Sequence, residues 1–143
     1  MENSVNKPFF IQDENVAQYA QLMASWIAQQ VKSAGRKGLV LGMSGGIDCS
    51  VVACLCRLAQ VDVHLVMMPY GSDMNNSKSP QHAMELIQKF DFPYHIFDIQ
   101  PAVDALMIQR EDFITEATAA NRALSLANIR PRVRMTYLYQ FAQ

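Results

Sequence analysis

An apolar run that ends in a glycine pair and passes directly into a helical pattern constrains this chain more than any other feature. The run 39–42 leads into Ser44-Gly45-Gly46. A helical apolar pattern then follows at Val51, Val52, Leu55 and Leu58. Glycines let backbone N–H groups crowd round an anion, and the N-terminus of the next helix adds a partial positive charge. This order predicts a phosphate-binding turn, with a purely structural Gly-Gly turn as the alternative.

The turn carries a more specific pattern. Ser44-Gly45-Gly46-Ile47-Asp48 resembles the SGGxDS pyrophosphate loop of ATP pyrophosphatases, enzymes that release AMP and pyrophosphate. It is not the nucleoside-triphosphate P-loop, because no Gly-Lys-Ser/Thr follows the glycines. Asp48 is also a candidate cap for the helix that follows, and the cap and the loop role are compatible.

Apolar segments predict strands and helices in alternation. Strands are expected at 38–43, 61–68 and 93–97, and the crossover helix after the first strand at 48–59. Alternation on a spacing of roughly 25–35 residues indicates βαβ units and a parallel sheet. Right-handed crossovers place the second strand beside the first and the third beyond it. We therefore predict an α/β fold with a three-layer, Rossmann-like sheet.

Helix ends are expected at residues with suitable capping chemistry. Asp13 is the expected cap of an N-terminal helix that ends at Gly35, and Ser79 the expected cap of a helix with Pro80 in its first turn. Asn128 is expected to cap the last helix, with Pro131 in its first turn. The lead-in 1–12 and the single domain 13–143 are the expected divisions of the chain.

Two features indicate a chain that is truncated after its third strand. The first strand of such a sheet should be central, yet nothing after residue 100 reads as a strand to cover its other side. The sequence also stops inside an apolar helical run, 137–143. We expect this to be the N-terminal part of a longer protein. The uncovered first strand is expected to associate with a second copy, because an open edge invites pairing.

Charge and cysteine content exclude several classes of protein. The 12 basic and 13 acidic residues give no electrostatic footprint for nucleic acid or an anionic membrane. No apolar run reaches the ~18–20 residues of a membrane span, and no signal-peptide pattern is present. The three cysteines Cys49, Cys54 and Cys56 lie in one segment, which disfavours disulfides and zinc. We expect buried thiols in a cytoplasmic protein.

Two further segments narrow the resemblance to one family. Val66-Met67-Met68-Pro69-Tyr70-Gly71 is similar to the end of the second strand in NAD synthetases, where a Pro-Tyr/His-Gly turn is typical. The segment 128–139 is similar to their N-x-x-A-R-x-R-M-x-x-x-Y pattern, and 37–44 to their entry into the loop. The resemblance runs from about Val16 to the last residue. On these motifs the chain is identified as a member of the ammonia-dependent NAD synthetases, N-terminal portion.

The resemblance implies an adenine-nucleotide α-hydrolase-like fold and a ligase activity. In that family ATP adenylates the nicotinate carboxylate of deamido-NAD, and ammonia then displaces AMP to give NAD. The residues implied at the ATP pyrophosphate are Gly42, Ser44, Gly45, Gly46, Asp48 and Cys49, with Asp48 also the ligand of Mg²⁺. Asn128, Arg132 and Tyr139 match positions that contact deamido-NAD, in part across a homodimer interface. The alternative for the arginines of this helix is a solvated face.

Three residues depart from the family pattern. Cys49 stands where Ser is usual, Pro131 replaces Ala, and Met67 occupies a position that is Arg near the ATP in several members. The family's second metal carboxylate, Gly-Thr-rich loop and later lysines fall beyond the equivalent of Gln143, so this chain is not expected to complete catalysis. The alternatives are another AMP-forming SGGxDS enzyme and a non-catalytic nucleotide-binding or dimerisation module.

Overall fold

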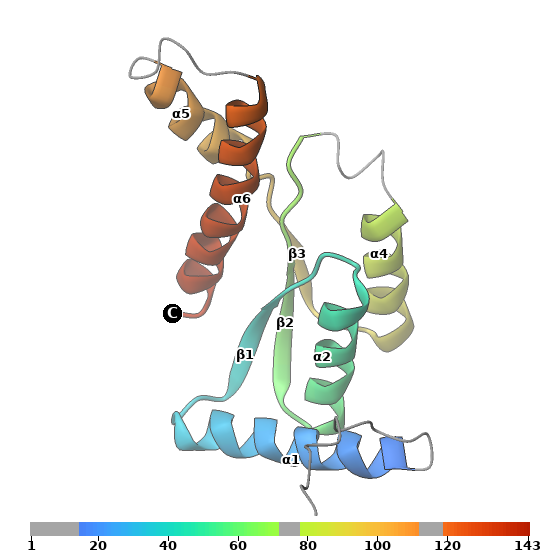
Figure 1. Ribbon diagram of the computed structural model, residues 1–143. Helices are drawn as coiled ribbons and strands as arrows, with labels where there is room; N and C mark the ends of the chain where they lie inside the picture. Colours follow the sequence, from blue (N-terminus) through green and yellow to red (C-terminus); the bar gives the residue numbers. More distant parts are fainter. Residues whose placement is uncertain (1–14, 72–77, 112–118) are drawn as a thin grey trace, which may run out of the picture.

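The computed structural model describes residues 15–71, 78–111 and 119–143. Helices and strands alternate, as predicted (Figure 1). In chain order the elements are α1 (Val16–Ser33), β1 (Gly38–Gly42), α2 (Ile47–Leu58), β2 (Asp62–Met67), α4 (Lys78–Phe90), β3 (Tyr94–Ile96), α5 (Gln100–Glu111) and α6 (Ala119–Phe141). The expected lead-in 1–12 and the Asp13 cap lie outside the described residues.

The three strands form one parallel sheet in the order β1-β2-β3. Leu39 is aligned with Val63, and Leu65 with Tyr94. This is the order predicted from right-handed crossovers. Within the described residues β1 has a strand partner on one side only, so β2 is the central strand.

Both faces of the sheet are covered, which makes a three-layer α/β/α arrangement. Alternate residues of β2 and of its exit enter different clusters: Val63, Leu65 and Met67 pack in one, and Val66 and Met68, the residue after the strand, pack in the other. The first cluster is closed by α2 and α4, and the second by α5 and α6. In Figure 1, α2 and α4 lie to one side of the strands, α5 and α6 lie to the other, and α1 crosses below their amino ends. The result is a truncated Rossmann-like fold.

Sequence-based positions for two helix caps are wrong by one residue or more. Gly46, with an extended backbone, is the N-cap of α2, so Asp48 lies inside the first turn and not at the cap. Ser79 lies inside the first turn of α4 beside Pro80, because that helix already includes Lys78. The Gly35 stop is confirmed: the residue follows the C-cap of α1 and has a φ of +64°.

The prediction that Asn128 begins the last helix is also wrong. Helix α6 starts at Ala119 and continues through Asn128, and Pro131 lies in its interior. The residues before Asn128 are mostly strong helix formers, and the Asn128 side-chain amide donates to the Leu124 carbonyl, 3.0 Å away, inside the helix. Burial of the apolar face of α6 against the sheet offsets the cost of an interior proline, about 3 kcal/mol in an isolated helix.

Candidate functional site

The β1–α2 loop passes close to the N-terminal turn of α4. Gly45 has a φ of +84°, and a Cβ atom at this position would lie 1.7 Å from the carbonyl oxygen of Ser79. Only glycine fits both the backbone conformation and this close approach. The Gly46 amide donates to the Ser44 hydroxyl at 3.2 Å, which folds the loop over the first turn of α2. The predicted glycine turn is therefore held between two helix N-termini.

Asp48 sits in the exposed first turn of α2, directly after this loop. No group of three or more His, Cys, Asp and Glu side chains is arranged to hold a metal ion in the part of the chain that the structure describes. A single carboxylate nevertheless suits Mg²⁺, which is commonly bound by one or two carboxylates together with substrate phosphates and water. The donor set thus fits a metal held jointly by Asp48 and a phosphate ligand.

Cys49 lies against the inner side of the same loop. Its thiol donates to the Gly46 carbonyl at 3.1 Å and lies 3.3 Å from the Ser44 hydroxyl. Burial alone raises the pKa of Cys49, but hydrogen bonds from the Ser44 side chain and from the backbone of Ser44, Gly45 and Gly46 outweigh it, so that the pKa lies below its ordinary value. Backbone groups that favour a thiolate form an environment that also suits a phosphate oxygen.

A cavity of about 450 Å³ opens beside the loop, at the carboxyl ends of β1 and β2. Parallel α/β sheets bind ligands at this edge. Its wall is mainly apolar and comes from the first two strands with their exits, from the start of α4 and from α6. The lining residues are Gly42, Met43, Ser44, Val66, Met67, Met68, Pro69, Ser79, Pro80, Pro131, Arg134, Met135 and Leu138.

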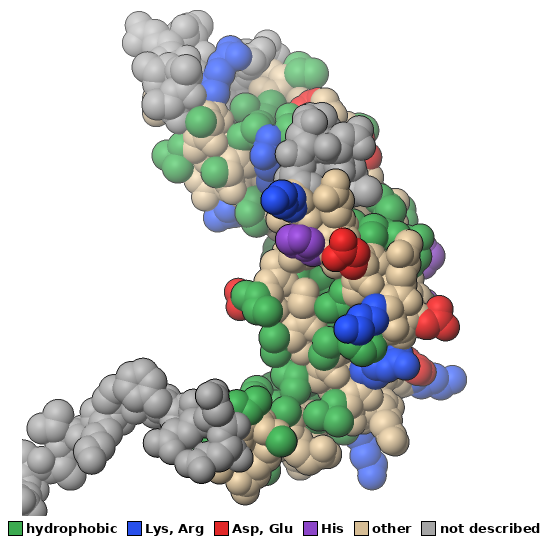
Figure 2. Space-filling model, turned by 90° about the vertical axis from the view of Figure 1, so that its right-hand side faces the viewer, with side chains coloured by type: hydrophobic (Ala, Val, Ile, Leu, Met, Phe, Trp, Pro, Cys, Tyr) green, Lys and Arg blue, Asp and Glu red, His purple; other side chains and the backbone are tan. Residues whose placement is uncertain are grey.

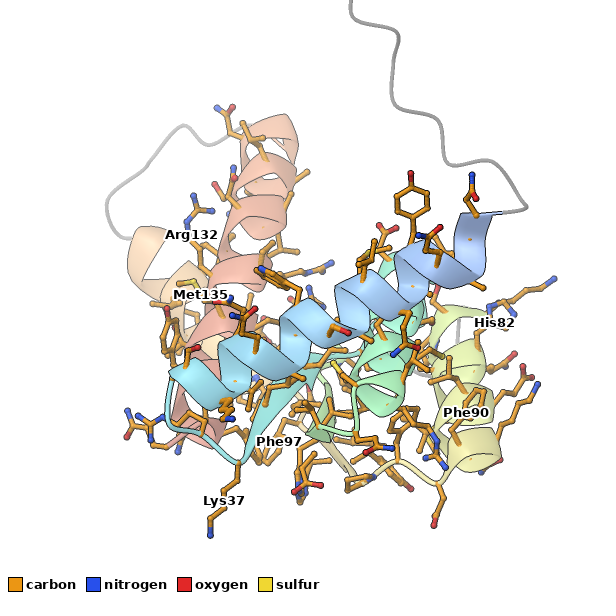
Figure 3. The ribbon with its side chains drawn as sticks, turned by 90° about the horizontal axis from the view of Figure 1, so that it is seen from below. Lys37, His82, Phe90, Phe97, Arg132 and Met135 are labelled. Atoms are coloured by element: carbon orange, nitrogen blue, oxygen red, sulfur yellow. The ribbon has the colours of Figure 1, made fainter. Side chains whose placement is uncertain are left out.

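Helix α6 presents two different faces to its surroundings. Arg134 lines the cavity, and its Nε donates to the Met68 carbonyl at 2.9 Å. The predicted substrate residues Asn128, Arg132 and Tyr139 are exposed and do not line the cavity. In Figure 3, Arg132 points away from the strands on the outer side of α6. The structure thus brings Gly42 and Ser44 to the cavity with Arg134, and it leaves Arg132 on a separate face.

Residues that the sequence interpretation did not single out surround the exit of β2. The Tyr70 hydroxyl donates to Asp104 at 2.8 Å, and the Arg130 guanidinium lies 3.8 Å from the centre of the Tyr70 ring. The hydrogen bond to Asp104 raises the pKa of Tyr70, with burial and the Asp104 charge acting in the same direction. In the sequence, the spacing of Arg130 and Arg134 is the feature that could have indicated this arrangement, because it places both side chains on neighbouring turns of one helix face.

A profile of the family described as NAD synthase matches residues 19–143. The chain belongs to the NAD synthase family. The NH3-dependent NAD+ synthetase of Finegoldia magna is 37% identical over 130 residues, which cover 90% of this chain and 50% of that protein. The chain thus spans about half the length of the curated relatives it matches.

Solved structures of NAD synthetases share the fold. The NH3-dependent NAD synthetase of Campylobacter jejuni, in complex with the nitrate ion, is 32% identical with a TM-score of 0.75, and the match covers 87% of this chain and 51% of that one. A glutamine-dependent NAD+ synthetase of Acinetobacter baumannii, in complex with ADP, is 25% identical with a TM-score of 0.77. The match covers 96% of this chain and 25% of that one. In the described part of this member of the NAD synthase family, no helix is long and apolar enough to cross a membrane.

Proposed function

We propose that this chain is the ATP-binding half of a synthetase that amidates deamido-NAD with ammonia and forms NAD, AMP and pyrophosphate. One observation carries the proposal: the Gly45 loop, at the N-terminus of α2, opens directly beside an apolar cavity at the carboxyl edge of the sheet. A phosphate cradle next to an apolar cavity suits a nucleoside triphosphate. The domain 13–143 is proposed as the N-terminal part of one synthetase domain.

The loop residues suit the pyrophosphate that leaves during adenylation. Attack of the nicotinate carboxylate on the α-phosphorus places growing negative charge on the β- and γ-phosphates. Backbone donors of Ser44, Gly45, Gly46 and Cys49 at the N-terminus of α2 stabilise that charge, with Gly42 at the strand end. Asp48 holds Mg²⁺, whose charge adds to the same stabilisation. Cys49 in place of the family's Ser leaves the backbone donors unchanged.

The apolar cavity suits the adenosine part of ATP. Met43, Met67 and Met68 line it together with prolines, and polarisable thioethers pack well against aromatic rings. Met67, where several relatives have Arg, contributes to this wall. The relative from Acinetobacter baumannii was solved with ADP, which supports an adenine nucleotide as the ligand.

The exposed face of α6 suits deamido-NAD bound partly between two copies. Asn128, Arg132 and Tyr139 lie along one stripe at spacings of about one and two turns, where a second chain could approach. A guanidinium recognises carboxylate and phosphate groups well. We place the deamido-NAD contacts on this face and propose a homodimer.

The decisive experiment joins this chain to the C-terminal half of the Finegoldia magna relative and assays NAD formation from deamido-NAD, ATP and ammonia. We expect NAD, AMP and pyrophosphate in equal amounts. Changing Asp48→Asn should lower the Mg²⁺-dependent rate at least about tenfold without loss of the fold. The control is the matched change Asp62→Asn, an exposed aspartate at the start of β2 and far along the strand from the loop.

Three results would count against the proposal. AMP release that does not depend on deamido-NAD would favour another AMP-forming enzyme of the same loop type. ATP binding without turnover by the joined protein would favour a non-catalytic nucleotide-binding module. Undiminished turnover of the Asp48→Asn protein would contradict the metal role of this residue.

A further inference from the structure

The exit of β2 is held by α6, by α5 and by Ile99, which directly precedes α5. The Met68 carbonyl accepts from Arg134, and the Pro69 carbonyl accepts from the Ile99 amide at 3.0 Å. Tyr70 contacts Asp104 and Arg130. A Cβ atom at Gly71 would lie 2.9 Å from the Gln100 side-chain oxygen. The sheet thus ends, and the contacts with the two helices begin, at the rim of the cavity.

The Arg130 guanidinium lies over the Tyr70 ring at the exit of β2. The guanidinium carbon lies 3.8 Å from the ring centre, well within the range of a cation–π contact. The Arg130 Nε is buried and has no hydrogen-bond partner among the described residues. A buried unpaired donor is costly and uncommon, so the contact with the Tyr70 ring contributes to holding Arg130 in this position.

The same contacts connect two groups of residues that line the cavity. Met67, Met68 and Pro69 form one wall, and α6 forms the facing wall with Pro131, Arg134, Met135 and Leu138. Arg130 and Arg134 lie one helical turn apart, and both reach across to the exit of β2. The hydrogen bond from Tyr70 to Asp104 of α5 favours the ring orientation that contacts Arg130.

We propose that Tyr70, Arg130 and Asp104, named here the β2-exit clamp, are positioning residues that set the width of the cavity for an adenine ring. None of the three lines the cavity. They act through the backbone of the β2 exit and through α6. This inference rests on the proposed binding of ATP and adds to it the residues that determine how tightly the adenosine part is held.

The β2-exit clamp should affect the binding of the two ends of ATP differently. Pyrophosphate binds at the β1–α2 loop, which is held by α2 and α4 and not by the clamp. AMP relies on the cavity between the β2 exit and α6. Weakening the clamp should therefore reduce affinity for AMP and leave affinity for pyrophosphate unchanged, a split that general destabilisation of the fold does not produce.

The test measures binding of AMP, ATP and pyrophosphate to the whole chain by calorimetry in the presence of Mg²⁺. Tyr70→Leu and Arg130→Met should raise the dissociation constant of AMP about tenfold, because a cation–π contact is lost. Tyr70→Phe keeps the ring under Arg130 but removes the hydrogen bond to Asp104, so its affinity for AMP should lie between those of the wild type and Tyr70→Leu. Tyr94→Phe and Arg36→Met, at exposed positions outside the clamp, are the matched controls.

A spectroscopic measurement reports on the clamp itself. Asp104→Asn should lower the pKa of Tyr70 seen in ultraviolet titration, because the carboxylate that raises it is removed. The inference is overturned if the wild-type chain binds AMP and the Tyr70→Leu and Arg130→Met proteins bind it equally well. It is also overturned if AMP and pyrophosphate lose affinity together in folded variants. If the wild-type chain binds neither AMP nor ATP, both the proposed function and this inference fail.

Discussion

At the scale of single residues, the two loop glycines have different physical roles. Gly45 combines a left-handed backbone with a close approach to the Ser79 carbonyl, whereas Gly46 has an ordinary extended backbone. A Cβ atom at Gly46 would meet only the Ser44 hydroxyl, at 3.4 Å. The sequence motif gives both positions the same letter, but only one of them is required by the packing of α4.

We therefore expect Gly45→Ala and Gly46→Ala to differ in stability. Gly45→Ala should lower the free energy of unfolding by about 2–4 kcal/mol, because backbone strain and a collision with α4 add together. Gly46→Ala should stay within about 1 kcal/mol of the wild type. Urea denaturation followed by circular dichroism measures both. Equal losses for the two variants would contradict the asymmetry.

Cysteine reactivity offers a second test at the residue scale. Hydrogen bonds in the loop lower the pKa of the partly exposed Cys49, whereas burial raises the pKa of Cys56, which is inaccessible to solvent. A lower pKa means more thiolate at a given pH, and the thiolate is the species that reacts. Iodoacetamide at pH 8 should thus modify Cys49 much faster than Cys56.

Peptide mapping by mass spectrometry measures the two alkylation rates. The control is the chain unfolded in guanidinium, where the rates should converge because burial and loop contacts are gone. Magnesium pyrophosphate should slow the reaction of Cys49 in the folded chain, since both compete for the same backbone donors. Faster alkylation of Cys56 would show that the loop does not favour a thiolate.

At the scale of elements, α6 lines part of the cavity and also has an exposed face outside it. It carries Pro131 in its interior, and its two faces separate Arg134 in the cavity from Arg132 outside it. Apolar residues pack α6 against the sheet: Val133 is buried, and Leu138 and Phe141 pack on the same cluster. Tertiary packing thus decides both the continuity and the rotation of this helix.

An interior proline should cost stability that alanine restores. Pro131→Ala adds a backbone donor for the Ala127 carbonyl, one turn earlier, and removes the ring from that turn. We expect the free energy of unfolding to rise by about 1–3 kcal/mol in thermal or urea unfolding. The matched control is Pro80→Ala in the first turn of α4, where proline is tolerated, with a change of about 0.5 kcal/mol or less. A destabilised Pro131→Ala protein would contradict this account.

At the scale of the whole molecule, several apolar surfaces are exposed. On α1 they include Leu22, Met23 and Trp26, and on α2 Ile47 and Val51. Figure 2 shows the side of the molecule that lies on the right in Figure 1. Hydrophobic side chains gather over its lower part, where α1 and α2 lie. In the described sheet β1 also has a free edge. Exposed apolar helix faces beside an open strand edge favour association.

We expect the isolated chain to associate at micromolar concentration. Trp26, the only tryptophan, is 61% exposed and lies on the α1 surface, so its emission should shift to shorter wavelength as the surface becomes covered. Sedimentation equilibrium measures the mass, and dilution should reverse both changes. A single monomer over the whole concentration range would contradict the expectation drawn from the open edge.

Much of the fold was accessible from local sequence. Continuous apolar runs marked three strands, and the structure confirms them within one or two residues at each end. The Ser-Gly-Gly turn marked the loop between β1 and α2, because glycine chemistry and strand-to-helix order are local properties. The family followed from motifs in the same segments. These features depend on neighbours in the chain, so the sequence alone determined them.

Other features depend on which segments meet in space. Capping preferences predicted a helix start at Asn128. Helix α6 packs on the sheet and extends through Asn128 without a break. Arg132 and Arg134 are the same residue type on the same helix, so the sequence does not distinguish them. The burial of Val133 and its neighbours turns Arg134 toward the cavity. The contact of Arg130 with Tyr70 joins residues 60 positions apart in the chain. Tertiary structure decided these, because a helix's rotation is set by the surface it packs against.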